Sequence, residues 1–287
     1  MTACILVTGV NGQVGAAIMA LKDDFPFKIV PISRADWDMA KEPEKAVDLI
    51  KRHQPDVVIN PAAYTNVDGA ENDQKTAFAV NALAVRELAR ACKKVKVPLL
   101  HVSTDYVFDG TKETPYTEND LINPINTYGK SKAEGEKLLR EMLDEHIILR
   151  TSWVFSTTGK NFFTTMQQLG KEFNELKIVD DQRGCPTSAD CIANALMKIA
   201  VKYLQGDTIP WGTYHYSGRP AVSWYEFAVA IFRKEDASRR PNLVRCASTE
   251  YPTNAARPQN SILSMANTIN QFKIEPCEWK DFLDINQ

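Results

Sequence analysis

The sequence lacks any cluster of residues that would hold a metal or form a disulfide framework. Its six cysteines are scattered, no Cys-x-x-Cys pair occurs, and the four histidines are equally dispersed. This distribution favours neither a zinc site nor a set of disulfides. Cys185 and Cys191 are close enough in sequence to share one site, although separate thiols are the simpler interpretation.

The chain also lacks a strong net charge and a long apolar run. A formal net charge of −2 over 287 residues gives no reason to expect nucleic acid or an anionic membrane as a partner. The chain enters a strand pattern at once, without a charged leader. We therefore expect no signal peptide and no membrane span, and place the protein in the cytoplasm by default.

What is present is a regular alternation of strand and helix patterns in the first half. Short apolar runs typical of buried strands occupy residues 3–7, 28–32, 56–60, 97–103 and 146–151. Helical patterns lie between them at residues 16–21, 44–53, 76–94 and 128–143. Continuous apolar strands separated by helices favour an α/β fold with a doubly wound, Rossmann-like parallel sheet. Such sheets bind ligands beyond the carboxyl ends of their strands.

A glycine-rich turn follows the first strand and opens the first helix. Its glycines, Gly9, Gly12 and Gly15, follow the pattern Gly-x-x-Gly-x-x-Gly. The first permits a tight turn, the second lets the backbone approach a pyrophosphate, and the third lets helix and strand pack closely. The turn predicts a dinucleotide site, with further contacts from Asn11, Gln13 and Val14. A glycine turn needed only for packing is the alternative.

The end of the second strand bears on which dinucleotide binds. It reads Ser33-Arg34, with no carboxylate before Asp36. A hydroxyl and a guanidinium suit a 2′-phosphate, so we favour NADPH. NADH is the alternative, with a solvated Arg34 and with Asp36 or Asp38 taking the ribose or adenine. The remaining predicted cofactor contacts are Met39 and, after the third strand, Ala62, Ala63 and Tyr64.

A tyrosine and a lysine lie one helical turn apart, at Tyr128 and Lys132. Nearby positive charge favours phenolate, so such a pair suits proton transfer at a carbon–oxygen bond. Thr104 ends the fourth strand and places a hydroxyl at the carboxyl edge of the sheet. We predict these three residues as catalytic. Taken singly, an exposed helical pair and a capping hydroxyl are the alternatives.

The second half is less regular. Helical patterns cover residues 162–173, 190–203 and 223–233, and a short strand covers 212–216. We expect residues 1–152 to form the dinucleotide-binding domain, with parts of about 180–200 and 212–217 returning to it. Residues 153–287 are expected to form mainly a smaller substrate-binding region.

Together the glycine turn, the strand-end hydroxyl and Tyr-x-x-x-Lys resemble the extended short-chain dehydrogenase/reductase superfamily. Within it, the chain is similar to the dTDP-4-dehydrorhamnose reductase family over nearly its whole length. The segments that carry this resemblance are residues 62–68, 103–108, 126–130, 150–154, 161–162, 181–187 and 256–261.

The resemblance implies reduction of the C4 keto group of dTDP-4-dehydro-L-rhamnose to dTDP-L-rhamnose, a precursor of bacterial surface polysaccharides. Tyr128 would be the general acid, Lys132 would hold the nicotinamide ribose and lower the phenol's pKa, and Thr104 would bond the reacting oxygen. The implied sugar-nucleotide contacts are Val67, Thr104, Asp105, Tyr106, Asn126, Trp153, Asn161 and Arg257. Some relatives are metal-linked dimers. This chain has no compact carboxylate cluster, so we predict no metal, while a homodimer stays open.

Two other functions compete. A sugar-nucleotide epimerase or dehydratase would share the fold, but an epimerase usually carries an acidic residue after the second strand. A dehydratase needs extra carboxylates beside the tyrosine, and here Tyr106 follows Asp105 where a glutamate would stand. The third hypothesis is a non-catalytic subunit, since regulatory subunits of eukaryotic methionine adenosyltransferase resemble this family. The sequence leaves the choice between a dTDP and a UDP sugar open.

Overall fold

The computed structural model describes residues 2–236 and 240–286. Its centre is a six-stranded sheet with the order β10-β5-β4-β3-β1-β2, in which every neighbouring pair is parallel. The strands are β1 (Cys4–Thr8), β2 (Lys28–Ile32), β3 (Val57–Asn60), β4 (Leu99–Thr104), β5 (His146–Thr151) and β10 (Gly212–His215). The predicted α/β fold with a parallel sheet is confirmed.

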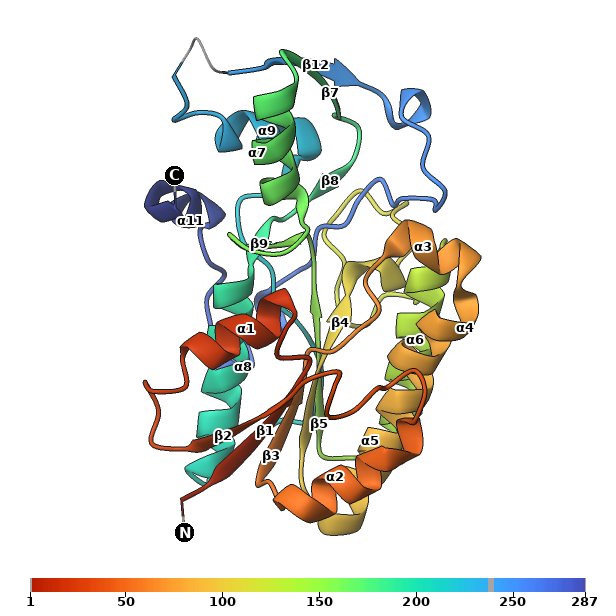
Figure 1. The fold of residues 1–287 in the computed structure, drawn as a ribbon, viewed down its shortest axis with the longest axis vertical. Coiled ribbons are helices and arrows are strands. Elements are labelled where there is room, and N and C mark those ends of the chain that lie inside the picture. Colours follow the sequence, from red (N-terminus) through yellow and green to blue (C-terminus); the bar gives the residue numbers. More distant parts are fainter. Residues whose placement is uncertain (1, 237–239, 287) are drawn as a thin grey trace.

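Helices cover both faces of this sheet (Figure 1). One face carries α1 (Gln13–Ala20), α8 (Ala189–Leu204) and α10 (Ala266–Phe272), and the other carries α2 (Ala46–His53), α5 (Ala84–Val95) and α6 (Thr127–Met142). The chain runs outward from β1 to β2 and then returns to place β3 on the other side of β1. This reversal is the switch point at which doubly wound sheets bind ligands.

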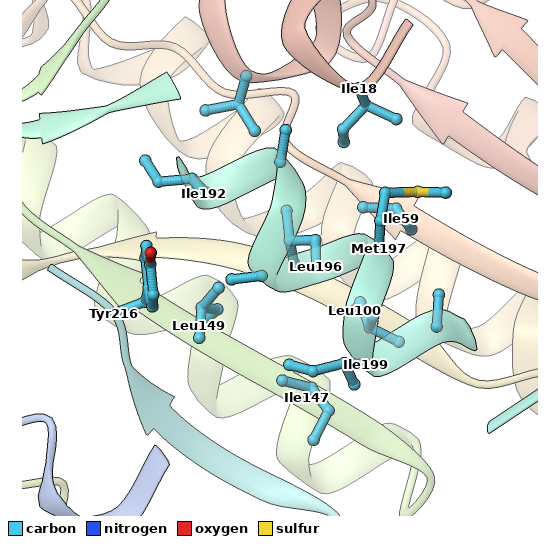
Figure 2. Close-up of a cluster of buried hydrophobic side chains, with 14 of the residues drawn as sticks. Ile18, Ile59, Leu100, Ile147, Leu149, Ile192, Leu196, Met197, Ile199 and Tyr216 are labelled. Carbon is cyan, nitrogen blue, oxygen red and sulfur yellow. The ribbon is translucent and has the colours of Figure 1, made fainter. Parts of the chain in front are cut away.

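The apolar core beneath α8 explains why α8 and β10, which come late in the chain, join the sheet. Ile192, Leu196 and Ile199 recur at helical spacing on one stripe of α8 and are fully buried. Figure 2 shows this stripe lying against Ile147 and Leu149 of β5. Each such side chain contributes about 1.5–3 kcal/mol on burial. The second half of the chain therefore completes the core of the first.

A second region lies beyond the carboxyl ends of the strands (Figure 1). Its elements are α7 (Phe162–Glu172), α9 (Trp224–Ile231), α11 (Trp279–Asn286) and the parallel pair β7 (Glu175–Val179) and β12 (Asn242–Cys246). Two short pairs connect it to the sheet: β6 (Val154–Phe155) with β9 (Thr187–Ser188), and β8 (Arg183–Gly184) with β11 (Val222–Ser223). It has its own apolar core, which includes Phe155, Phe163, Phe227 and Trp279.

The helix predicted at residues 76–94 is interrupted. The structure has α4 (Gln74–Phe78), a π-helical turn at Ala79–Leu83, and then α5. The π turn presents the Asn81 side chain to the loop after β3, and a Cβ on Gly135 of α6 would lie 2.0 Å from the Asn81 carbonyl oxygen. Tight packing against α6 and this side-chain bond account for the extra residue in the turn.

The remaining elements are short. They are α3 (Val67–Asn72) and three 3₁₀ turns at Pro43–Lys45, Asp105–Val107 and Ser248–Glu250. In the part of the chain that the structure describes, no helix combines the length and apolarity that crossing a membrane requires.

Candidate active site

The glycine turn after β1 requires glycine at two positions. Gly9 has a φ of +58°, and a Cβ there would lie 2.7 Å from the Cα of Ala62 in the loop after β3. A Cβ on Gly15 would lie 2.2 Å from the carbonyl oxygen of Gly9. Gly12 is the N-cap of α1, and no side chain caps this helix. The N–H groups of its first turn thus stay available for an anion at the positive end of the helix dipole.

The predicted contacts in this turn have different surroundings. Asn11 is exposed, whereas Val14 is buried in the core below the sheet. The Gln13 side chain accepts hydrogen bonds from Ser156 Oγ and Asn161 Nδ2, both at 2.9 Å. Asn161 also caps α7 by accepting from the backbone N–H of Thr164. Gln13 and Asn161 therefore join the glycine turn to the second region.

The segment after β2 holds its polar groups in local pairs. Ser33 Oγ donates to Asp36 Oδ2 at 2.6 Å, and this bond together with the Ser33 N–H keeps the pKa of Asp36 below its usual range. Arg34 Nε lies 3.4 Å from Asp38 Oδ2, but its side chain is 77% exposed. Met39 is buried. The Arg34 guanidinium is held only loosely at this strand end and is able to turn toward a ligand.

The loop after β3 is tied to α6 by Asn81, a residue that the sequence patterns did not single out. Ala62, Ala63 and Tyr64 are half-buried there. Asn81 Oδ1 accepts from the Tyr64 N–H at 2.8 Å, and Asn81 Nδ2 donates to the Tyr64 carbonyl at 3.0 Å. The same amide donates to Ser131 Oγ at 2.9 Å. One buried side chain thus sets the distance between this loop and the helix that carries Tyr128.

Thr104 and Tyr128 lie together at the carboxyl end of β4. Thr104 Oγ1 donates to Asp105 Oδ1 at 2.9 Å, accepts from the Tyr106 N–H at 3.2 Å, and also bonds the Tyr128 phenol. The Tyr106 and Tyr128 rings meet edge to face, with centroids 5.8 Å apart. Burial raises the pKa of Tyr128, against the effect of the Thr104 hydrogen bond. The phenol is therefore protonated at neutral pH, as a general acid must be.

Asp105 is a buried carboxyl next to this pair. Burial raises its pKa to about 6, although hydrogen bonds from Ser261 and Thr104 act in the opposite direction. At neutral pH it carries most of a negative charge beside Thr104, and the Coulomb effect of that charge helps to keep the Tyr128 pKa high.

Lys132 lies one turn after Tyr128 and is 1% exposed. Its Nζ donates to the Val102 carbonyl at 2.7 Å and lies 3.2 Å from His101 Nε2. Burial lowers the Lys132 pKa to about 8, and Glu136 opposes that shift. The ammonium therefore bonds to groups of β4, while burial raises the pKa of the Tyr128 phenol. The lowering of the phenol's pKa by Lys132, expected from the resemblance, is not seen in this arrangement.

Two more of the predicted sugar contacts, Asn126 and Arg257, have structural partners. Asn126 caps α6 by accepting from the Gly129 N–H, and its Nδ2 donates to the Ala256 carbonyl at 2.8 Å. Arg257 Nη2 pairs with Asp68 Oδ2 of α3 at 2.6 Å, next to Val67, the first residue of that helix. These bonds hold residues 256–257 against α3 and α6, beside Tyr128.

Trp153 follows β5 in a left-handed conformation with φ of 47°. Its ring stacks on Trp224 at a centroid distance of 3.4 Å, and a Cβ on Gly184 would lie 2.3 Å from it. The residue as a whole is half-buried. Among residues 2–236 and 240–286, no group of three or more His, Cys, Asp or Glu side chains is placed to bind a metal.

Comparison with known proteins identifies the family. The family model described as the RmlD substrate binding domain matches residues 2–285. A dTDP-4-dehydrorhamnose reductase of Aggregatibacter actinomycetemcomitans is 42% identical over 281 residues, which cover 96% of this chain and 95% of the relative. A crystal structure of such a reductase from Clostridium acetobutylicum ATCC 824 has a TM-score of 0.91 and 35% identity, covering 98% and 97% of the two chains.

Another crystal structure, of the Bacillus anthracis dTDP-4-dehydrorhamnose reductase in complex with NADP, also has a TM-score of 0.91, with 33% identity over 99% of this chain and 98% of that one. These matches extend over both the sheet and the second region, at identities well above the level at which only the fold is shared. The chain therefore belongs to the RmlD substrate-binding domain family, whose relatives named here are dTDP-4-dehydrorhamnose reductases.

Proposed function

We propose that this protein reduces the C4 keto group of dTDP-4-dehydro-L-rhamnose to dTDP-L-rhamnose, with hydride from NADPH and Tyr128 as the general acid. The observation that carries the proposal is the set of Thr104, Tyr128 and Lys132 at the carboxyl ends of β4 and its neighbours. The names of the relatives support the substrate. NADH in place of NADPH is the alternative donor.

The cofactor fits the residues at the switch point. The uncapped first turn of α1 suits a pyrophosphate, and the glycines at 9 and 15 let this turn pack closely against Ala62 and against its own backbone. Ala62, Ala63 and Tyr64 would line the ribose and nicotinamide, and Arg34 with Ser33 would hold a 2′-phosphate. The NADP complex of the Bacillus anthracis relative supports this choice. When bound, the nicotinamide supplies the hydride.

The chain's own residues then manage the proton and the developing charge. Tyr128, protonated because burial raises its pKa, gives its proton to the C4 oxygen. The Thr104 hydroxyl would turn from Asp105 to donate to the same oxygen and stabilise its negative charge. The Lys132 ammonium would hold the nicotinamide ribose with the donor that Val102 and His101 leave free. Holding the two reactants in contact supplies much of the acceleration.

The sugar nucleotide would lie between β4, α6 and the second region. Asp105, Tyr106 and Asn126 would surround the sugar, and Trp153 would offer it a ring face. Arg257 would reach the diphosphate from its pairing with Asp68.

Residues 1–152, with about 180–200 and 212–217, would form the cofactor domain, and residues 153–287 mainly the substrate region. We place the protein in the cytoplasm, and a homodimer is compatible with this proposal.

The assay that tests the function follows the loss of absorbance from NADPH, and separately from NADH, with dTDP-4-dehydro-L-rhamnose generated in place. Stoichiometric oxidation supports the reductase. Conversion of the sugar nucleotide without net oxidation would instead indicate an epimerase or dehydratase. Tight binding without any turnover, with a transferase copurifying, would favour the non-catalytic subunit. A parallel run with the UDP sugar decides the nucleotide.

Replacing Arg34 by alanine is expected to weaken NADPH binding about tenfold while leaving NADH binding nearly unchanged, because a charge-assisted bond to the 2′-phosphate is lost. Dissociation constants from NADPH and NADH fluorescence measure this. Lys41→Ala is the matched control, since Lys41 shares the partner Asp38 at 3.8 Å and is 78% exposed. Equal affinities for both cofactors in the unmodified protein, with Arg34→Ala indifferent, would remove the NADPH preference.

A further inference from the structure

A fully buried chain of polar side chains runs behind Lys132 and is not used by the mechanism above. It crosses three neighbouring strands: Thr8 ends β1, Asn60 ends β3, and His101 lies in β4 opposite Asn60. All three side chains are no more than 1% exposed. Thr8 Oγ1 bonds Asn60 Oδ1 at 2.5 Å, Asn60 Nδ2 lies 3.0 Å from His101 Nδ1, and His101 Nε2 lies 3.2 Å from Lys132 Nζ.

The hydrogen-bond capacity of Lys132 makes this contact important. An ammonium has three N–H donors. The Val102 carbonyl takes one, and the imidazole is the second protein acceptor. One donor is left for the phenol or a ribose hydroxyl. Without the imidazole, a buried cation would keep a single protein acceptor, and a buried charge is tolerated only when it is well paired.

The imidazole is suited to this part only when it is neutral. Burial, and next the charge of Lys132, hold the His101 pKa well below its usual range. A neutral ring that accepts at Nε2 carries its proton on Nδ1, so Asn60 must face it with the carbonyl oxygen. Turning the Asn60 amide by half a turn provides this and keeps a bond to the Thr8 hydroxyl, now as acceptor. The contact with Lys132 thus selects the tautomer of the ring, and Asn60 and Thr8 can accommodate it.

We propose that His101 is a positioning residue, whose neutral imidazole accepts a hydrogen bond from Lys132 and keeps that ammonium charged and aimed past β4 toward the site of Tyr128. The inference rests on the proposed function, since the charge of Lys132 matters only if Tyr128 and a nicotinamide ribose use it. His101 itself touches neither the substrate nor the cofactor. Figure 1 shows β4, which carries His101, beside α6, which carries Lys132.

Other charged groups near Lys132 and His101 also shift the pKa values of these two residues. On α6, Glu136 raises the Lys132 pKa. On β5, His146 slightly lowers the His101 pKa, and Arg150 neutralises Glu136 through a buried ion pair. Asn60 on β3 is uncharged. Removing the His101 ring therefore takes away a direct acceptor of the ammonium while leaving these charges in place.

The test reads the Lys132 pKa directly, without substrate or cofactor. In protein labelled with [13C]lysine, the side-chain signal of Lys132, assigned by its loss in Lys132→Met, should titrate near pH 8, well below ordinary lysines. His101→Leu and His101→Asn should lower the midpoint by about one pH unit, the size expected for a lost bond to a charged group. His101→Gln, whose longer amide reaches Lys132, should restore most of the shift.

His146→Leu is the control for losing a buried histidine, because His146 bonds the Leu143 carbonyl and lies at the opposite end of the sheet from the site. It should leave the Lys132 midpoint unchanged. If His101→Leu fails to fold, the Asn and Gln variants still decide, since they differ by one methylene. An unshifted midpoint in His101→Asn, or equal midpoints in the Asn and Gln variants, would overturn the proposal.

Kinetics give an independent reading. In His101→Asn the alkaline limb of the pH profile of kcat/KM should shift by about one pH unit toward lower pH, as the Lys132 midpoint does. The KM for NADPH should rise several-fold. Both effects should be reversed in His101→Gln. A merely structural role would lower stability without moving the limb. If the unmodified protein consumes no NADPH with the sugar nucleotide, the proposed function fails, but the lysine titration still stands or falls by itself.

Discussion

Replacing Tyr128 by phenylalanine is expected to lower kcat by about 10²-fold or more, with the fold intact. The change removes only the hydroxyl that would protonate the C4 oxygen. The ring keeps its edge-to-face contact with Tyr106, and Thr104 loses one hydrogen-bond partner but keeps Asp105 and the Tyr106 N–H. Single-turnover oxidation of NADPH with the sugar nucleotide measures the loss, and NADPH fluorescence shows that binding survives.

Tyr214→Phe is the control, because it also removes a tyrosine hydroxyl; that hydroxyl donates to the Pro210 carbonyl, which precedes β10. Its kcat should equal that of the unmodified protein. The pH profile adds a second reading. Since burial raises the pKa of Tyr128, activity should not fall near neutral pH through loss of that proton. Nearly full turnover in Tyr128→Phe would exclude Tyr128 as the acid.

Replacing Glu136 by leucine should reduce the free energy of unfolding by about 3–5 kcal/mol, the usual result of removing one partner of a buried ion pair. Glu136 is fully buried on α6. It accepts from Arg150 Nη2 at 2.7 Å and Nε at 2.9 Å, and from Ser103 Oγ at 2.6 Å. Without it, the contacts left to the Arg150 guanidinium among the described residues would be His215 Nε2 at 3.4 Å and the Phe108 ring.

Urea unfolding of three variants separates the causes. The double variant Glu136→Leu with Arg150→Met should lose less free energy of unfolding than Glu136→Leu alone, because no uncompensated charge is left buried. Glu134→Leu, on the exposed side of α6, should change stability by less than about 0.5 kcal/mol. A double variant no more stable than the single one would show that packing, and not the buried charge, causes the loss.

The pH dependence of this penalty has a definite sign. Burial by itself would raise the Glu136 pKa, but the hydrogen bonds and charge of Arg150 hold it below its usual value. A carboxyl whose folded pKa is depressed contributes stability above its unfolded pKa of about 4.3 and loses that contribution as the pH falls through the folded value. The difference between Glu136→Leu and the unmodified protein should therefore shrink below about pH 4.

The strands and the glycine turn were predictable because their signals are local. The apolar run of β1 and the spacing of Gly9, Gly12 and Gly15 lie within a dozen residues. The π turn at Asn81 was not predictable, because it depends on contacts with Tyr64 and Ser131, which are 17 and 50 residues away. Only a polar residue within an apolar helical stretch marked it, and many such residues are simply exposed.

The directions in which the side chains of the site point could not be predicted from the sequence either. The spacing of Tyr128 and Lys132 places them on one face of α6, but whether the ammonium turns to the phenol or to β4 depends on which acceptors β4 offers. His101 was a visible polar interruption in the apolar run of that strand. Similarly, Asn126 and Arg257 were expected at the sugar. No local sequence pattern predicts that Asn126 bonds the Ala256 carbonyl or that Arg257 pairs with Asp68.

The helix α6 carries Tyr128, Lys132 and Glu136 at intervals of four residues, so the proposed acid, its ammonium neighbour and the main buried anchor form one continuous stripe. Selection for a stiffer or looser protein would act on the same few turns as selection for rate. Adjusting thermal tolerance through α6 would then change turnover as well. Variants that improve durability without this trade-off should map to α8 and the aromatic core of the second region instead.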